Sequence, residues 1–383
     1  MQREIPMSLR LAIAQMDVSE VNVAEFCRDH QISRDRFYTI RRRYQAEGEA
    51  GVAPRSRTPH TVGNRTSTAV EDLVVTLRKQ LDNDGLDAGA ETIKWHLEEA
   101  GIDAPTTSTI WRILRRRGFI VPDPKKAPNK TWHRFVADYV NEMWQIDATH
   151  TELGDGTEVD IINILDDHSR ICTRSHAVEG STTGSDAWDA LVTAIATYGI
   201  PAWLLADNGA PFTSNLFTSN LEAIQVNTTN SRPFHPQTCG KVERFHQTLK
   251  KWLAARPKPE TVAELQELLD VFVDIYNTQR PHRGIHRRTP VEVFDTTPKI
   301  GPDAFSSLDE TTIHYNKVDR SGRVEIPGPY SITIGAAHTG QTATTIRSGN
   351  TAHVFINNKL VRKLTINPSR RSQPLYQRPG RPT

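Results

Sequence analysis

Three acidic residues, far apart in the sequence, stand where carboxylates could act together on a phosphodiester bond. Asp147 lies in the apolar run WQIDAT, Asp207 ends the run LLAD, and Glu243 lies in GKVERFHQTLK, which has helical spacing. We predict both aspartates near the ends of strands, where α/β sheets usually place ligand-binding residues. Carboxylate oxygens are the ligands that Mg²⁺ and Mn²⁺ prefer, so the set predicts a divalent-metal site.

Chemistry at phosphorus explains why three carboxylates are needed. Two ions about 3.5–4 Å apart can activate the attacking oxygen and stabilise the leaving oxygen. We therefore predict two Mg²⁺ or Mn²⁺ ions, with Asp147 bridging both, Asp207 on one and Glu243 on the other. A single aspartate at a strand end is more often a cap or a solvated turn, so the prediction depends on the set.

Basic and polar residues accompany Glu243 on its predicted helix. Gln247 and Lys250 follow it by four and seven residues and so share its face, while Lys241 and Arg244 flank it. We predict that these four side chains hold DNA phosphates beside the metal site.

The segment just before this helix, residues 231–240, contains two prolines and no regular period, so it is predicted to be a mobile loop that orders over DNA. His235 in this loop is better explained as a surface histidine than as a proton relay. Asn208 and Gly209 are predicted to turn the chain sharply after Asp207.

The elements that must position these acids form a mixed α/β domain at residues 135–295. Apolar runs predict strands, and apolar residues at helical spacing predict helices. The expected strands are residues 142–149, 158–167, 170–178 and 200–207, and the expected helices are residues 183–199, 214–223, 238–255 and 262–278.

A helix-turn-helix unit is predicted at residues 8–50. A short helix at 23–30 is followed by a tight turn, with Ser33 placed to cap a second helix at 34–48. One face of that second helix is apolar, and its basic residues point elsewhere, as in a helix that enters the major groove. The apolar residues are Phe37, Ile40 and Tyr44, and the predicted DNA contacts are Arg36, Arg42 and Arg43. A helix pair without DNA-binding function is the alternative.

A second helix-turn-helix unit is predicted at residues 66–120, with helices at 91–101 and 107–118. Trp111 and Leu114 are expected to face inward, and Arg112 and Arg116 are expected to contact DNA. The alternative is a plain helical bundle with a basic last turn. Basic linkers follow both units.

The C-terminal part contains several short runs typical of strands, separated by Gly and Asn, and predicts a small β-barrel-like domain at residues 306–365. A basic tail at 367–383 is predicted to be disordered. The fold class is thus multidomain: N-terminal all-α helix-turn-helix units, a central α/β core and a small C-terminal β domain.

Composition narrows the class of protein further. The 383 residues carry a net charge of +2, but basic stretches at 110–134 and 367–383 surround an acidic stretch at 152–167. That distribution suits a protein that grips a polyanion and binds cations at one place. Three widely spaced cysteines imply neither a disulfide framework nor a zinc site. The sequence contains no long apolar run and its first residues do not read as a secretory signal, so a cytoplasmic protein, nucleoid-associated when bound to DNA, is expected.

The acids and their neighbours resemble a known family. Asp147, Asp207 and Glu243, with 35 residues between the last two, resemble the D,D(35)E pattern of retroviral-type integrases and bacterial transposases. The strings WQIDAT, DDHSR, ADNGAPF, HPQTCGKVERFHQTLK and YNTQRPHRGIHRRTP resemble that integrase core. With the helix-turn-helix units before it, the chain over about residues 15–300 is similar to insertion-sequence transposases of the IS481 group, close to IS3.

The resemblance implies a ribonuclease H-like core, two divalent metals and a homo-oligomer, a dimer or larger, on paired inverted-repeat DNA ends. It assigns the metal to Asp147, Asp207 and Glu243, and matches Lys250 to the family's basic residue. It leaves the acidic pair Asp166 and Asp167 outside the triad. Tyr276, Asn277, Arg280, Pro281 and His282 match the Y-N-x-x-R-P-H signature and are interpreted as structural support with DNA contact as a further role. The His/Cys zinc module of viral integrases is absent from this sequence.

Two other functions fit parts of the pattern. A ribonuclease H-like nuclease would cut without joining, and a DNA-binding regulator would carry an inactive core. The tandem recognition units argue against the first, and the complete acidic triad argues against the second.

Overall fold

The computed structural model describes residues 5–55, 66–120, 136–230, 240–302 and 311–375. These form two compact units, Met1–Arg65 and Thr66–Thr383. All but the last residue of the predicted loop at 231–240, with His235, and most of both linkers lie outside the described residues. No helix within the described ranges is both long and apolar enough to cross a membrane.

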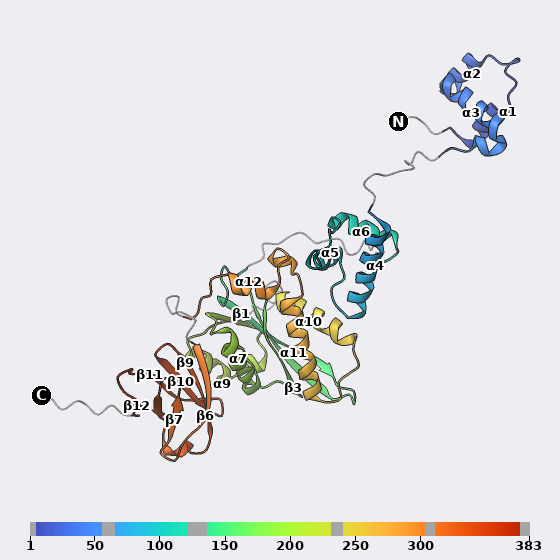
Figure 1. The fold of residues 1–383 in the computed structure, drawn as a ribbon. Helices are drawn as coiled ribbons and strands as arrows, with labels where there is room; N and C mark the ends of the chain where they lie inside the picture. The colour runs from blue at the N-terminus through green and yellow to red at the C-terminus, as the bar shows by residue number, and fades with distance from the viewer. Residues whose placement is uncertain (1–4, 56–65, 121–135, 231–239, 303–310, 376–383) are drawn as a thin grey trace. The chain divides into compact units, whose positions relative to one another are not determined.

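The first unit is a small helical domain (Figure 1). Its elements are α1 (Met7–Gln15), α2 (Val23–Asp29), α3 (Arg34–Glu47) and the 3₁₀ turn η1 (Gly48–Val52). Ser33 caps α3 as predicted, since its hydroxyl accepts a hydrogen bond from the backbone N–H of Arg36 at 3.2 Å. Phe37 and Ile40 are buried in the core and Tyr44 packs against it, which confirms the predicted apolar face of this helix.

The second unit begins with three more helices, α4 (Thr68–Asn83), α5 (Ala90–Glu99) and α6 (Thr107–Arg116). Ile110, Ile113 and Leu114 of α6 are buried against the other two helices. The prediction that Trp111 faces inward is wrong, because this side chain is 41% exposed and lies under the guanidinium of Arg115, 5.3 Å from the ring centroid. It follows Ile110 by one residue, about 100° around the helix from the apolar stripe.

The central domain is built on a five-stranded mixed sheet with strand order β3-β2-β1-β4-β5. The strands are β1 (Met143–Glu152), β2 (Glu158–Asp166), β3 (Cys172–Glu179), β4 (Trp203–Ala206) and β5 (Asn227–Asn230). Strands β1, β2 and β3 pair antiparallel, whereas β4 pairs parallel with both β1 and β5. The sequence analysis missed β5, because the polar run NTTN at the sheet edge shows no alternation of apolar and polar residues.

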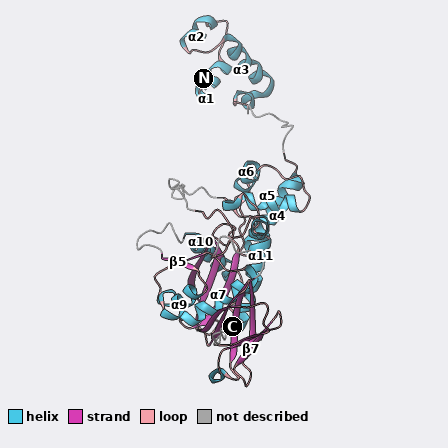
Figure 2. Ribbon diagram, turned by 90° about the vertical axis from the view of Figure 1, so that its left-hand side faces the viewer, coloured by secondary structure: helices cyan, strands magenta, loops and turns pink. Residues whose placement is uncertain are grey.

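Helices cover both faces of this sheet (Figure 2). One face buries Trp144 and Ile146 of β1 against α7, and the other buries Leu165 of β2 against Phe245 and Phe272 of α10 and α11. The helical elements are α7 (Gly184–Tyr198), α8 (Ala210–Thr213), α9 (Asn215–Ala223), α10 (Gly240–Ala254), α11 (Val262–Thr278), η3 (Arg283–Ile285) and α12 (Pro290–Thr296).

The C-terminal region is β-rich, but it is not the predicted barrel. Its described strands form two sheets, ordered β11-β10-β9-β6 and β12-β8-β7, and neither is closed. The elements are β6 (Thr311–Lys317), β7 (Arg323–Ile326), β8 (Tyr330–Thr333), η5 (Ala336–His338), β9 (Thr342–Ser348), β10 (Thr351–Ile356), β11 (Lys359–Thr365) and β12 (Ser372–Gln373). Strand β12 also contradicts the expected disorder of that part of the tail.

This region packs on the central domain. The ring of Phe355 lies against that of Trp188 in α7, with centroids 5.1 Å apart. The side-chain amide of Asn358 donates to Asp189 Oδ1 at 2.9 Å, and the backbone carbonyl of Asn358 accepts from the Asn220 side-chain amide at 2.7 Å. An apolar contact and a polar contact therefore join the β-rich region to the helices on one face of the core.

Candidate active site

Two of the three predicted acids are brought together by the pairing of β1 with β4. The parallel register ends with Ile146 opposite Ala206, so Asp147 and Asp207 are the next residues of two neighbouring strands. Asp147 is not near the end of its strand, as the sequence suggested, but in the middle of β1, which continues to Glu152 along β2. It is nevertheless the first residue of β1 after the segment that pairs with β4.

The turn after β4 fixes the Asp207 carboxylate. The backbone N–H of Gly209 donates to Asp207 Oδ1 at 2.8 Å, which closes the sharp turn predicted for this segment. A Cβ atom added to Gly209 would lie 2.8 Å from the same oxygen. A side chain at this position would therefore displace the carboxylate, which explains why glycine suits the second residue after the aspartate.

The third acid comes from α10, which packs across β1. Glu243 lies in the first turn of this helix, and His246 follows one turn later with Nδ1 3.8 Å from Asp147 Oδ2. The pKa of the Asp147 carboxyl is raised to about 6, mainly by burial and also by the charges of Asp207 and Glu243, while a hydrogen bond from the Ala148 N–H acts to lower it. Both other predicted carboxylates thus act electrostatically on Asp147.

Two observations concern the predicted metal site. Within the described residues, no three His, Cys, Asp or Glu side chains lie close enough to form a ready metal-binding group. The donor set nevertheless fits Mg²⁺ or Mn²⁺, because carboxylate oxygens suit these ions and a bound dication would relieve the mutual repulsion around Asp147.

His246 is a residue of this site that the sequence analysis missed. Its side chain is 12% exposed, and its buried Nε2 has no hydrogen-bond partner among the described residues. Burial lowers the pKa of the imidazole to about 4, with Lys250 acting in the same direction, so the ring is neutral at pH 7. The signal that could have found it is its spacing of three residues from Glu243, which predicts a neighbouring position on the helix.

The basic residues predicted around Glu243 divide into two groups. Gln247, Lys250 and Arg244 are exposed with Glu243, and Arg244 donates to Gln247 Oε1 at 2.9 Å. Lys241 instead points into the domain, where its ammonium forms an ion pair with Asp167. Burial lowers the pKa of Lys241 to about 8, assisted by the charge of Arg170 and opposed by that of Asp167.

The arginines predicted to contact DNA from the helix-turn-helix units also differ in their surroundings. Arg42 of α3 and Arg112 of α6 are exposed, whereas Arg36 and Arg43 are half-buried. Arg116 is engaged within the protein, since its guanidinium lies 2.5 Å from the buried carboxylate of Glu71. DNA contact by all five stays a prediction.

The acidic pair after β2 has a structural environment, in keeping with its place outside the triad. The Asp166 carboxylate accepts hydrogen bonds from the backbone N–H groups of Asn141 at 2.8 Å and Ser169 at 2.7 Å. The Asp167 carboxylate accepts from Ala137 N at 2.8 Å and from the amide of Gln145 at 2.6 Å. Both side chains are almost fully buried.

The Y-N-x-x-R-P-H segment also has a structural role. The Asn277 side chain bonds both backbone groups of Cys172, accepting from N and donating to O at 2.9 Å each, and so ties α11 to β3. Arg280 lies 2.6 Å from the carboxylate of Asp87 in the loop before α5, and the His282 imidazole accepts from the Gly284 N–H at 3.1 Å. Burial raises the pKa of Tyr276 to about 12.

Comparison with known families matches this geometry. A family described as "Integrase core domain" matches residues 137–236, and a second of the same description matches 224–290. Residues 137–290 are thus similar to integrase cores. A "Helix-turn-helix domain" family matches residues 10–60, and a "Homeodomain-like domain" family matches residues 36–114. The integrase core and the helix-turn-helix segments together support a DNA transposase or integrase function.

Curated relatives agree with the family matches. The chain is 26% identical over 224 residues to the transposase for insertion sequence element IS904 of Lactococcus lactis, which covers 56% of this chain and 84% of that protein. It is 26% identical over 235 residues to the transposase for transposon Tn552 of Staphylococcus aureus, covering 53% of this chain but 47% of that protein. Among solved structures, the catalytic core of HTLV-2 integrase in complex with magnesium aligns with 41% of this chain and 98% of that one, at 19% identity and a TM-score of 0.34.

Proposed function

We propose that the protein is a DNA transposase that binds the inverted-repeat ends of an insertion sequence, cuts the DNA there and joins the ends to target DNA. What supports this proposal is that Asp147 and Asp207 follow paired residues of β1 and β4, and that the charge of Glu243 on α10 acts on Asp147, inside the matched integrase core. The proposal also covers three points expected from the sequence: a ribonuclease H-like fold of the core, membership of the IS481 group, and the domain boundaries given above.

Asp147, Asp207 and Glu243 would together hold two divalent ions. When bound, such ions activate the attacking oxygen and stabilise the leaving oxygen of an in-line displacement at phosphorus. One site can therefore run both hydrolytic cleavage and attack by the freed 3′-hydroxyl.

The chain's own residues contribute position and charge around that chemistry. Gly209 holds the Asp207 carboxylate, and the neutral His246 ring packs beside Asp147 without adding a competing positive charge. Lys250, Arg244 and Gln247 lie on the exposed side of α10 and would hold DNA phosphates near Glu243.

The helix-turn-helix units would supply recognition of the DNA ends. Arg42 of α3 and Arg112 of α6 are exposed on the helices that correspond to recognition helices. Two paired ends require at least two copies of the catalytic core, so we propose a homo-oligomer on DNA that acts in the cytoplasm on nucleoid DNA.

The test uses labelled element ends, a target plasmid and Mg²⁺ with the full-length protein. Asp147→Asn, Asp207→Asn and Glu243→Gln are each expected to bind ends with unchanged affinity and to lose cleavage and joining by at least about 10³-fold. Asp155→Asn, which changes an exposed acid in the turn between β1 and β2, is the matched control and is expected to remain active.

Three results would contradict the proposal. Substantial joining by Asp147→Asn would remove the metal role assigned to the triad. Cleavage by the unmodified protein without any joined product would indicate a nuclease. Binding of ends without Mg²⁺-dependent turnover would indicate a regulator.

A further inference from the structure

The helix that carries Glu243 is fastened to the sheet by a buried ion pair. Lys241 is the second residue of α10, and its ammonium group pairs with the Asp167 carboxylate at the end of β2. The Lys241 side chain is 19% exposed and that of Asp167 is 1% exposed. The two residues are 74 positions apart in the sequence, so the pair joins separate elements of the core.

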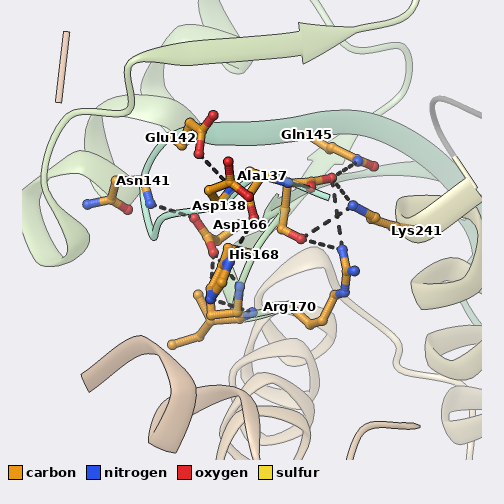
Figure 3. A network of polar contacts seen from close by, with 12 residues as sticks. Ala137, Asp138, Asn141, Glu142, Gln145, Asp166, His168, Arg170 and Lys241 are labelled. Atoms are coloured by element: carbon orange, nitrogen blue, oxygen red, sulfur yellow. Dashed lines mark hydrogen bonds and ion pairs between the residues drawn. The ribbon is translucent and has the colours of Figure 1, made fainter. Parts of the chain in front are cut away.

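The carboxylate of Asp167 is itself held in place by residues on the central sheet and next to it. It accepts hydrogen bonds from the Ala137 N–H and from the side-chain amide of Gln145, and its own backbone N–H donates to Met143 O at 2.8 Å. Gln145 lies two residues before Asp147 on β1. Figure 3 shows the side chains of Gln145, Lys241 and Arg170 converging in this network. The pair therefore links the first turn of α10 to the strand that carries Asp147.

Helix preferences do not explain a lysine at this position. A positive charge in the first turn of a helix opposes the helix dipole, and a buried ammonium is costly unless it is paired. Residues two apart on a helix are rotated by about 200° from each other, so Lys241 reaches Asp167 while the exposed Glu243 side chain points in a different direction. Lys241 can thus fix the helix without occupying the space beside Glu243.

We propose that the Lys241–Asp167 ion pair is a positioning device, which holds the first turn of α10 and so fixes where Glu243 lies relative to Asp147. Lys241 acts through the helix, not on DNA, in contrast to the role predicted for it from sequence. The catalytic consequence of this inference rests on the proposed function. The anchoring of α10 does not, because it is a property of the metal-free protein.

Hydrogen exchange of the metal-free, full-length protein tests the anchoring directly. Lys241→Met keeps the aliphatic stem and removes the charge. We expect amides in the peptide spanning residues 240–250 to exchange at least about tenfold faster in this variant. Lys241→Arg is expected to restore most of the protection. Lys258→Met is the matched control, because it removes an exposed lysine paired with Glu152 at 3.1 Å, and we expect no change in that peptide.

Measurements of metal binding and DNA binding then test whether the anchoring of α10 matters for function. We expect Lys241→Met to weaken Mn²⁺ binding, measured by titration calorimetry, by about tenfold, while its affinity for DNA ends stays within about twofold of the unmodified protein. Adding Asp167→Asn to Lys241→Met is expected to add little, because the pair acts as a unit. If Lys241→Met does not fold, Lys241→Gln, which keeps a donor for Asp167, takes its place in the same measurements.

Two outcomes would overturn the inference. One is exchange in residues 240–250 that is unchanged in Lys241→Met. The other is a loss of DNA affinity with unchanged exchange, which would make Lys241 a DNA contact after all. Failure of the proposed function would look different: Asp147→Asn would retain joining activity, whatever the exchange measurements showed.

Discussion

Replacing Gly209 with alanine should damage catalysis while leaving the fold and DNA binding intact. The backbone of Gly209, with φ −61° and ψ 146°, is open to any L-residue, so the change brings no backbone strain. The new methyl carbon, however, would stand 2.8 Å from Asp207 Oδ1, closer than ordinary contact. The carboxylate must rotate, and it then loses the hydrogen bond from the residue 209 N–H.

The size of the effect follows from these two changes. A lost hydrogen bond of this kind changes stability by only about 0.5–1.5 kcal/mol. Moving a catalytic group by about 1 Å can reduce the rate by about 10²-fold. We therefore expect Gly209→Ala to lower the single-turnover joining rate by about 10–100-fold, with the unfolding free energy within about 1.5 kcal/mol of the unmodified protein.

The assay is joining of pre-cut labelled ends under single-turnover conditions, with end binding measured in parallel. Gly240→Ala is the control, because an added Cβ there would meet nothing within 4 Å. If Gly209→Ala joined ends at the rate of the unmodified protein, the carboxylate position would not matter to catalysis, and the reasoning from the turn would be refuted.

Three further predictions concern stability and DNA binding. Phe355→Ala, at the buried contact with Trp188, should lower the unfolding free energy of the second unit by about 3–5 kcal/mol in a denaturant titration, and a loss below about 1 kcal/mol would mean that the β-rich region is not packed as described. Burial lowers the pKa of His353 to about 4, so protonation of this residue disfavours the folded state. The unfolding free energy should therefore fall as the pH drops from about 6.5 to 4. His353→Asn should make this fall smaller, as measured by unfolding curves at a series of pH values. DNA affinity should fall steeply with salt, and Arg112→Ala should reduce the slope of log affinity against log salt by about 1, whereas a flat response would contradict the arginine assignments.

Local features of the fold could be predicted from the sequence because they depend on neighbouring residues. The capping of α3 by Ser33 and its apolar face follow from spacing within one helix, and the turn at Gly209 follows from the residues beside it. The prediction for Trp111 was wrong because this aromatic residue lies next to the apolar stripe of its helix in the sequence. Whether such a residue is buried depends on tertiary packing, which the sequence does not show.

Features that join distant segments could not be predicted in this way. The edge strand β5 carries almost no apolar signal and forms because β4 offers a partner, and the opening of the C-terminal strands into two sheets depends on their pairing. Lys241 was interpreted as a DNA contact because its buried partner, Asp167, is distant in the sequence, in the turn just after β2. The three acids could be picked out as a candidate set from their motifs, whereas the neighbouring His246 became evident only once α10 was placed across β1.

The most direct test of the account is anomalous diffraction from crystals of the protein soaked in Mn²⁺. The account predicts anomalous density between the carboxylates of Asp147, Asp207 and Glu243, and its disappearance in Asp147→Asn crystals. Manganese bound elsewhere, or no density at this place at a saturating concentration, would contradict the claim that these three side chains form the metal site.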